Sequence, residues 1–167
     1  MKTLILVRHG KAAHSHSKGG DMDRPLTHRG KIESALMAEQ FHEFGVRVHA
    51  VLSSPALRAK ATAKEFADWA VLPVGVDERL YDAGVSELLD VVQGAEDFHE
   101  TIMLVGHNPG ISEFLRVLLD SEYTNMPPAS VAVVSFDVHE WVDIIADSGE
   151  LEWFMDPKVI AAENKAA

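Results

Sequence analysis

The sequence predicts an α/β fold, a three-layer α/β/α sandwich around a mostly parallel central sheet of about six strands. Short apolar runs of strand length alternate with stretches of helical periodicity, which is typical of a parallel sheet with helices on both faces. Two of these runs are followed by the Ser, Asn and Pro residues that commonly start helices. The 167 residues, 47% hydrophobic and 25% charged, also have the composition of a single globular domain.

Six segments are predicted as strands. Three of them are apolar throughout, as buried strands are. The other three are an edge strand that contains Pro73 and Gly75, an alternating segment, and a last strand after a turn at Gly149. In chain order the six are residues 4–7, 50–52, 71–76, 101–105, 130–136 and 151–155.

Helices are predicted between these strands. Thr27 can cap a helix that runs to about Phe44, and the pair Ser54-Pro55 has the cap-plus-proline signature of a helix that runs to about Trp69. Residues 85–92 fit a short helix.

A further helix begins at Asn108-Pro109 and carries one apolar stripe, which predicts packing against a sheet. A last short helix has three large apolar residues. The stripe consists of Ile111, Phe114, Leu115, Leu118 and Leu119, and the short helix contains Trp141, Ile144 and Ile145.

Charge and composition exclude several classes of function. The net charge is 15 − 26 = −11, which disfavours nucleic acid and anionic membranes as partners because both bind clustered cations. The absence of cysteine excludes disulfides, cysteine zinc sites and a thiolate nucleophile. The apolar run 3–7 is too short for a signal peptide, and no stretch reaches the ~18 apolar residues of a membrane span. We therefore expect a cytoplasmic monomer, with one domain over residues 1–167 and a frayed tail at 161–167.

Basic side chains follow three of the predicted strands. Arg8 and His9 follow the first, Arg58 comes shortly after the second, and His107 follows the fourth. Ligands of open α/β sheets bind at the carboxyl ends of the strands, so these four groups converge where a ligand would lie. Arginine matches phosphate oxygens bidentately, and the helix N-termini at Ser54 and Asn108 add N–H donors. The sequence therefore predicts an anion pocket.

Within this pocket His9 is the natural nucleophile, because a neutral imidazole can attack phosphorus and nearby positive charge lowers its pKa. Gly10 would allow a tight turn and close approach of the ligand. Each residue alone has an ordinary explanation: His9 as a solvated histidine, Arg58 as a surface helix residue, and His107 as a loop histidine with satisfied hydrogen bonds. Their convergence in an acidic protein favours the functional reading.

These motifs resemble those of the histidine phosphatase superfamily, also called the phosphoglycerate mutase-like or RHG family, and most of all its small SixA-type phosphohistidine phosphatase branch. The similar blocks occur in the family's order over residues 4–110. They are Arg8-His9-Gly10-Lys11-Ala12, Asp23-Arg24-Pro25-Leu26-Thr27 with Arg29-Gly30, Ser53-Ser54-Pro55-Ala56-Leu57-Arg58-Ala59 with Thr62-Ala63, and Val105-Gly106-His107-Asn108-Pro109.

The resemblance implies a phosphoglycerate mutase-like fold and a metal-independent phosphatase without cofactors. In such an enzyme His9 attacks phosphorus to form a phosphohistidine intermediate that water hydrolyses. Arg8, Arg58 and His107 would hold the phosphoryl oxygens and stabilise their charge, with Asn108 and Gly10 also at the phosphate. The implied substrate is phosphohistidine on a protein.

The general acid of larger family members is not clearly matched. Asp82 and Glu87 are the candidates, and each fits a helix surface or cap equally well. The SixA-type branch lacks a clear acid, which suits P–N substrates because a basic nitrogen leaves with little help. The loop 11–24 contains His14, His16, Lys18, Asp21 and Asp23. We interpret it as a solvated loop that contacts the substrate, rather than as a metal site.

Three alternatives remain open. The chain can be a phosphomonoesterase that acts on a small phosphate ester with Asp82 or Glu87 as general acid. It can be a non-catalytic phosphate-binding module, which would tolerate Gln at position 9. A mutase is the weakest alternative, because it needs a closed pocket to retain its intermediate.

Overall fold

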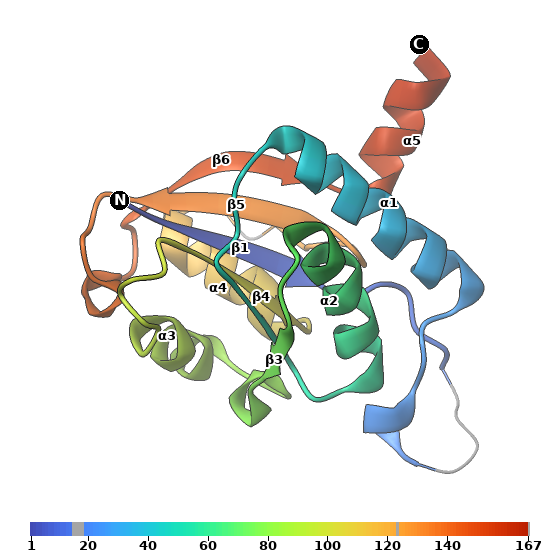
Figure 1. Ribbon diagram of the computed structural model, residues 1–167, viewed down its shortest axis with the longest axis horizontal. Helices are drawn as coiled ribbons and strands as arrows, with labels where there is room; N and C mark the ends of the chain where they lie inside the picture. The colour runs from blue at the N-terminus through green and yellow to red at the C-terminus, as the bar shows by residue number, and fades with distance from the viewer. Residues whose placement is uncertain (15–18, 123, 167) are drawn as a thin grey trace.

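The computed structural model describes residues 1–14, 19–122 and 124–166, which form one mixed sheet with helices on both faces (Figure 1). The strands are β1 (Lys2–Arg8), β2 (Ala50–Ser53), β3 (Val74–Val76), β4 (Thr101–Gly106), β5 (Val131–Phe136) and β6 (Gly149–Met155). The α-helices are α1 (His28–Phe44), α2 (Leu57–Ala70), α3 (Val85–Gln93), α4 (Gly110–Leu119) and α5 (Pro157–Ala166). Short 3₁₀ turns lie at Asp21–Asp23, Glu78–Leu80 and Trp141–Asp143.

The sheet has the strand order β3-β2-β4-β1-β5-β6. The four strands from β3 to β1 are parallel, whereas β5 and β6 pair antiparallel at the other side. The prediction of a mostly parallel sheet of about six strands is confirmed. The predicted edge strand is also at the edge, although it is only three residues long.

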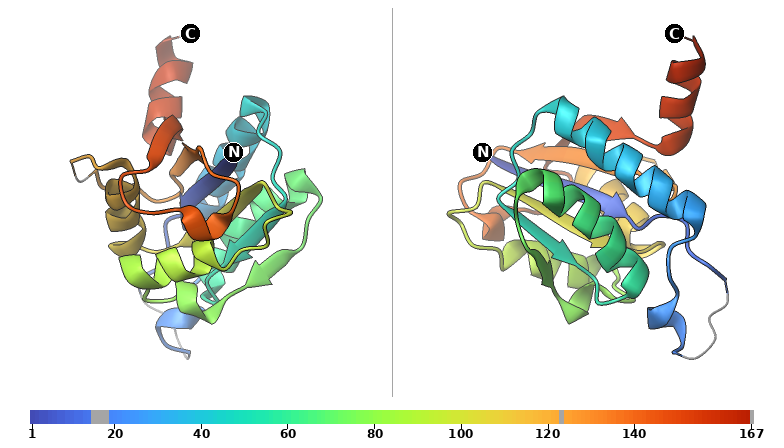
Figure 2. Two further views of the ribbon diagram at one scale, coloured as in Figure 1. Left: turned by 90° about the vertical axis from the view of Figure 1, so that its left-hand side faces the viewer. Right: turned by 45° about the vertical axis from the view of Figure 1, so that its right-hand side comes forward.

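Helices cover both faces of the sheet, so the predicted three layers are present. Helices α1 and α2 lie on one face and α3 and α4 on the other (Figure 2). Consecutive residues of β1 alternate between these faces: Leu4 and Leu6 pack toward α3 and α4, whereas Ile5 and Val7 pack toward α1 and α2. Helix α5 packs on the same face as α1 and α2, through the buried Ile160.

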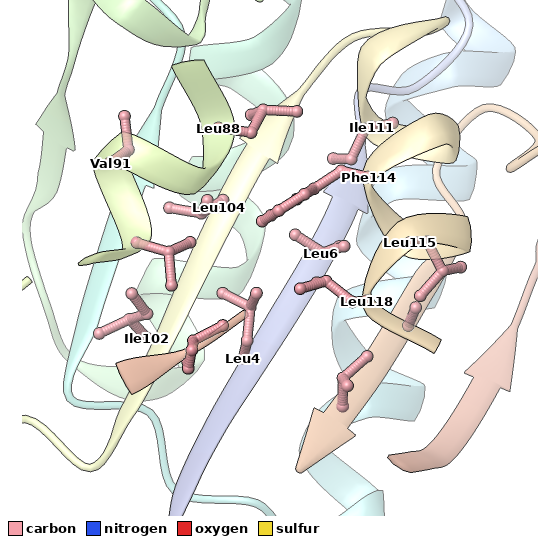
Figure 3. Packing of buried hydrophobic residues seen from close by; sticks show 14 of the residues in the cluster. Leu4, Leu6, Leu88, Val91, Ile102, Leu104, Ile111, Phe114, Leu115 and Leu118 are labelled. Atoms are coloured by element: carbon pink, nitrogen blue, oxygen red, sulfur yellow. The ribbon is translucent and has the colours of Figure 1, made fainter. Parts of the chain in front are cut away.

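The apolar stripe predicted on α4 packs against β1 and β4 (Figure 3). Ile111, Phe114, Leu115 and Leu118 are buried there, and Leu119 is half-buried at the end of the helix. Continuous burial of this kind explains why the strands are apolar throughout instead of alternating.

Two predicted helix starts are wrong by a few residues. Thr27 caps α1 as expected, with its hydroxyl accepting a hydrogen bond from the Gly30 N–H. Helix α2, however, begins at Leu57, because Ser54 accepts the Ala56 N–H in a turn before the helix. Helix α4 begins at Gly110, with Pro109 rather than Asn108 at its N-cap position.

The C-terminal part differs from the expectation at three places. The short helix expected at Trp141 is a 3₁₀ turn that ends at Asp143. Gly149 lies in β6 rather than in the turn before it. The strand needs a glycine there, because a Cβ at this position would lie 2.6 Å from a Val134 methyl group. The tail expected to fray from residue 161 continues α5 to Ala166.

Candidate active site

The carboxyl ends of β1, β2 and β4 lie side by side, and each is followed by a residue of the predicted site. The register aligns Arg8 with Gly106 and Ser53 with Val105. His9 and Ser54 continue this ladder, since their N–H groups donate to the Gly106 and Val105 carbonyls, both at 3.1 Å.

A pocket of about 310 Å³ opens at these strand ends. Its lining includes all four basic residues predicted from the sequence, together with residues from the loops around them. The lining consists of Arg8, His9, Asp21, Arg24, Arg58, Tyr81, Asp82, Ala83, His107, Asn108 and Pro109.

His9 is held in one orientation and one tautomer. Its Nδ1 lies 2.7 Å from the Gly10 carbonyl oxygen, which can only accept, so Nδ1 carries the proton and Nε2 keeps its lone pair. Burial lowers the pKa of His9 from 6.5 to about 3, and the positive charges of Arg58 and Arg8 add smaller contributions in the same direction. Positive charge, the cause expected from the sequence, is thus a smaller contribution to the pKa of His9 than burial. His9 is therefore a neutral imidazole at physiological pH.

His107 lies beside His9, with ring centroids 5.0 Å apart. Its Nδ1 is 3.4 Å from Nη2 of Arg58, which can only donate, so the proton of the neutral ring is on Nε2. That proton points to the Ser54 hydroxyl oxygen at 2.7 Å. Burial, followed by the charge of Arg58, lowers the pKa of His107 to about 4. Both pocket histidines are thus neutral in the unliganded protein.

Arg58 is the second residue of α2 and its side chain is buried. Its Nη1 donates to the backbone carbonyl of Asp21 at 2.7 Å, and its Nη2 donates to Oδ2 of Asp21 at 2.9 Å. The buried Nε makes no hydrogen bond within the described part of the chain. Asp21 therefore accepts hydrogen bonds from both terminal nitrogens of the Arg58 guanidinium group.

Asp21 is a pocket residue that the sequence analysis placed only in the flanking loop. Its carboxylate accepts the Tyr81 hydroxyl at 2.5 Å and Nη1 of Arg24 at 2.9 Å, in addition to Arg58. These bonds, that of Tyr81 first, hold the pKa of Asp21 well below its usual range. The same bond raises the pKa of Tyr81. Asp21 is consequently an ionised, fixed anion beside the guanidinium groups of Arg24 and Arg58.

Arg8 and Asn108 anchor the segment before β5 to the pocket. Nη1 of Arg8 donates to the Met126 carbonyl at 2.8 Å. Nδ2 of Asn108 donates to the same carbonyl at 3.1 Å and to Oδ1 of Asn125 at 2.8 Å, and its Oδ1 accepts the Ser112 hydroxyl at 2.7 Å. The side-chain amide predicted at the phosphate is thus engaged in holding the loop.

Gly10, which was predicted at the phosphate, packs against α1 in the structure. It is buried, it does not belong to the described lining of the pocket, and its N–H donates to the Thr62 hydroxyl at 3.0 Å. A Cβ there would lie 2.5 Å from the Ser34 Oγ and 2.9 Å from the Gly30 carbonyl oxygen. Gly10 therefore permits close packing against α1 rather than close approach of a ligand.

Of the two candidate acids, Asp82 is among the residues that line the pocket and Glu87 is not. Asp82 lines the pocket, is exposed and has a left-handed backbone with φ of 54°. Glu87 is exposed in the first turn of α3 and is not among the described residues of the pocket wall. Only Asp82 is close enough to the pocket to act on a ligand there.

No group of three or more His, Cys, Asp or Glu side chains that could hold a metal ion occurs among the described residues. His14 is exposed, Asp21 points into the pocket, and His16 and Lys18 lie outside the described residues. Across the same described part, no helix has the length and apolar character needed to cross a membrane.

Comparisons with known proteins identify the family and support the fold. The model of the histidine phosphatase superfamily (branch 1) matches residues 4–92. The phosphohistidine phosphatase SixA of Escherichia coli K12 is 29% identical over 158 residues, which cover 92% of this chain and 93% of that protein. A solved structure of the protein histidine phosphatase SixA complexed with tungstate superimposes with a TM-score of 0.80 at 28% identity, and covers 95% of this chain and 99% of that one.

A mycobacterial glucosyl-3-phosphoglycerate phosphatase shares the fold at 19% identity, with a TM-score of 0.66 and coverage of 91% and 97%. Proteins similar to this chain thus include phosphatases named for phosphohistidine and for a small phosphate ester. The motifs, the six-stranded sheet and the family match lead to one conclusion: the chain belongs to the histidine phosphatase superfamily and is a phosphatase.

Proposed function

We propose that this phosphatase hydrolyses phosphohistidine on a protein, through a covalent phosphohistidine intermediate at His9 and without a metal ion. The observation that carries the proposal is the state of His9: its Nδ1–H is fixed on the Gly10 carbonyl, its pKa is about 3, and its ring lies in a pocket with three guanidinium groups. A neutral imidazole with a free Nε2 lone pair is the nucleophile that attack on phosphorus requires.

In the first step, Nε2 of His9 forms a bond to phosphorus while the P–N bond of the substrate breaks. A phosphohistidine that is protonated on its other ring nitrogen leaves as neutral imidazole, so the enzyme need not supply a proton. Arg8 and Arg58 neutralise the charge that spreads over the phosphoryl oxygens. These fixed cations supply the positive charge that magnesium supplies in many other phosphoryl-transfer enzymes.

In the second step, water attacks the phosphoryl group on His9, and the P–Nε2 bond breaks with its electron pair returning to Nε2. The proton that the water loses passes to an oxygen of the phosphate that forms. His107 assists both steps in a protonated form. Its Nδ1 accepts from Arg58 in the unliganded protein, so binding a phosphate oxygen requires a proton there. A phosphoryl dianion beside Nδ1 favours that protonation, because an opposite charge raises a histidine pKa.

The acidic groups of the pocket favour a P–N over a P–O substrate. Asp21 is held ionised by three hydrogen-bond donors, so it has no proton to give an alkoxide leaving group. Asp82 is exposed to solvent at the pocket wall, and Glu87 lies elsewhere. A leaving nitrogen needs less help than a leaving alkoxide.

The test is hydrolysis of a phosphohistidine protein, a small phosphoramidate and p-nitrophenyl phosphate by the wild type, in the presence of a chelator. We expect faster turnover of the two P–N substrates, and acid-labile phosphate on the enzyme after rapid quenching. His9→Ala should lose both, whereas His139→Ala removes an exposed histidine outside the pocket and should lose neither. Unimpaired turnover by His9→Ala would refute the covalent mechanism.

A phosphomonoesterase of small esters is the second candidate, favoured by the position of Asp82 in the pocket wall. It requires the ester to be the better substrate, and Asp82→Asn to slow the ester far more than the phosphoramidate. Binding of phosphate without turnover of any substrate would instead support the non-catalytic module.

A further inference from the structure

A second groove of about 360 Å³ adjoins the catalytic pocket. The two share Arg8, His9 and Arg24, so a substrate with its phosphorus at His9 can extend from one into the other. The described lining consists of Arg8, His9, Lys11, Ala12, His14, Arg24, Arg29, Glu33, Pro127, Pro128, Pro157 and Lys158.

The groove is cationic in a protein whose net charge is −11. Among its described lining residues the only acid is Glu33, which already accepts Nε of Arg29 at 3.1 Å. Lys11 and Lys158 are exposed, and neither forms an ion pair with any other described residue. The neighbouring Asp156 is engaged in capping α5 through the Lys158 and Val159 N–H groups, at 2.8 and 3.0 Å. Two lysines are thus available to an external anion.

The residues that line the groove suit a polypeptide ligand. Its apolar part is formed by Ala12 and three prolines, which have little conformational freedom to lose when a partner packs on them. Its free cations come from two distant parts of the chain, Lys11 three residues after the end of β1 and Lys158 at the start of α5. Cations spread in this way suit several acidic side chains of an extended segment better than a single compact anion.

Building on the proposed function, we infer that this groove binds acidic residues next to the phosphohistidine of the protein substrate. The catalytic pocket recognises the phosphoryl group, and the groove adds a preference for Asp and Glu around it. Charge complementarity of this kind acts mainly on association and on choice of partner, and it weakens with salt.

Two phosphohistidine peptides of equal length test the inference, one with Asp and Glu around the phosphohistidine and one with Asn and Gln. For the wild type at low ionic strength we expect kcat/KM to be roughly tenfold higher for the acidic peptide, and the ratio to shrink at ~0.5 M salt. Lys11→Glu/Lys158→Glu should reduce this ratio to one or below. The control is Lys165→Glu, which makes the same charge change as Lys158→Glu alone, two turns further along α5, and should leave the ratio unchanged.

Equal kcat/KM for both peptides in the wild type would overturn the inference, as would an equal loss of preference in Lys165→Glu, which would indicate net charge alone. Failure of the proposed function gives a different result, with no hydrolysis of either peptide or of a small phosphoramidate. In that case, binding of the unphosphorylated acidic peptide, measured by fluorescence anisotropy for the wild type and the double variant, decides the inference. Tighter binding to the wild type supports it, and equal binding overturns it.

Discussion

Asp21→Asn should make the pocket bind phosphate more tightly. In the unliganded protein the carboxylate of Asp21 takes Nη2 of Arg58, which the proposed mechanism needs for a phosphoryl oxygen. Substrate and carboxylate therefore compete for one guanidinium group. The substitution keeps the size of the side chain and removes its charge.

The magnitude follows from the contacts. A hydrogen bond to a charged partner contributes ~1.5–3 kcal/mol when it is protected from water. The side chain of Asp21 is 48% exposed, so solvent screening reduces the value of its bond with Arg58 to about 1 kcal/mol. Removing this competition should lower the dissociation constant of phosphate about fivefold. Arg58 should keep its orientation, because Nη1 still donates to the backbone carbonyl of residue 21 at 2.7 Å.

The assay is competitive inhibition by inorganic phosphate, with binding measured independently by calorimetry. Asp23→Asn is the matched control: it removes the same charge from the same 3₁₀ turn, at an exposed residue that makes no ion pair with any described residue. Its phosphate affinity should stay close to that of the wild type. Weaker phosphate binding by Asp21→Asn would refute the reasoning, because it would mean that Asp21 mainly orients Arg58 for its ligand.

Four further predictions concern the pocket and its support. The ring of His9, with its pKa lowered to about 3, should remain neutral in an NMR titration down to pH 5, where a histidine of pKa 6.5 would be ~97% protonated; a midpoint near 6.5 would contradict the assignment. In the unfolded chain His9 and His107 become protonated below pH 6.5, whereas in the folded protein their pKa values are about 3 and about 4. The unfolded state therefore binds more protons in this range, and the free energy of unfolding should fall as the pH drops through it. Arg58→Ala should lower kcat/KM by about 10²-fold or more through lost charge stabilisation, with Arg58→Lys recovering only part of it; unchanged kinetics in the alanine variant would remove Arg58 from the mechanism. Gly10→Ala should reduce the free energy of unfolding by about 1–3 kcal/mol, because its Cβ would lie 2.5 Å from the Ser34 Oγ. Thermal melting measures this cost. The control is Gly84→Ala, where the nearest atom is a flexible Glu87 oxygen at 3.2 Å.

The sequence was sufficient for the fold class and for the convergence of the basic residues. Apolar runs mark buried parallel strands, and the carboxyl ends of neighbouring parallel strands meet at one edge. Arg8, His9 and His107 adjoin such ends, so their meeting follows from position in the chain. Arg58 follows as well, since the second residue of α2 can reach back to the same edge.

Other features depend on contacts that sequence spacing does not reveal. The carboxylate of Asp21 meets Arg58 and Tyr81 across separations of 37 and 60 residues, and nothing in its local pattern distinguishes it from Asp23. The role of Gly10 depends on how closely α1 approaches it, which requires the packed structure. The start of α2 shifted because Ser54 serves as a turn residue and as the partner of His107. Capping residues in the local sequence predict where a helix starts, but they do not reveal tertiary contacts of this kind.

The position of β1 ties the proposed nucleophile, His9, to the hydrophobic cores on both faces of the sheet. This strand lies between β4 and β5, its residues Leu4 to Val7 are completely buried, and His9 directly follows it. Fluctuations that open the edge strands β3 or β6 leave the pairing of β1 intact. Unfolding of β1, in contrast, disrupts the hydrophobic cores on both faces of the sheet. The histidine is thus anchored to the last part of the molecule to unfold, so enzymatic activity should report on global rather than local denaturation.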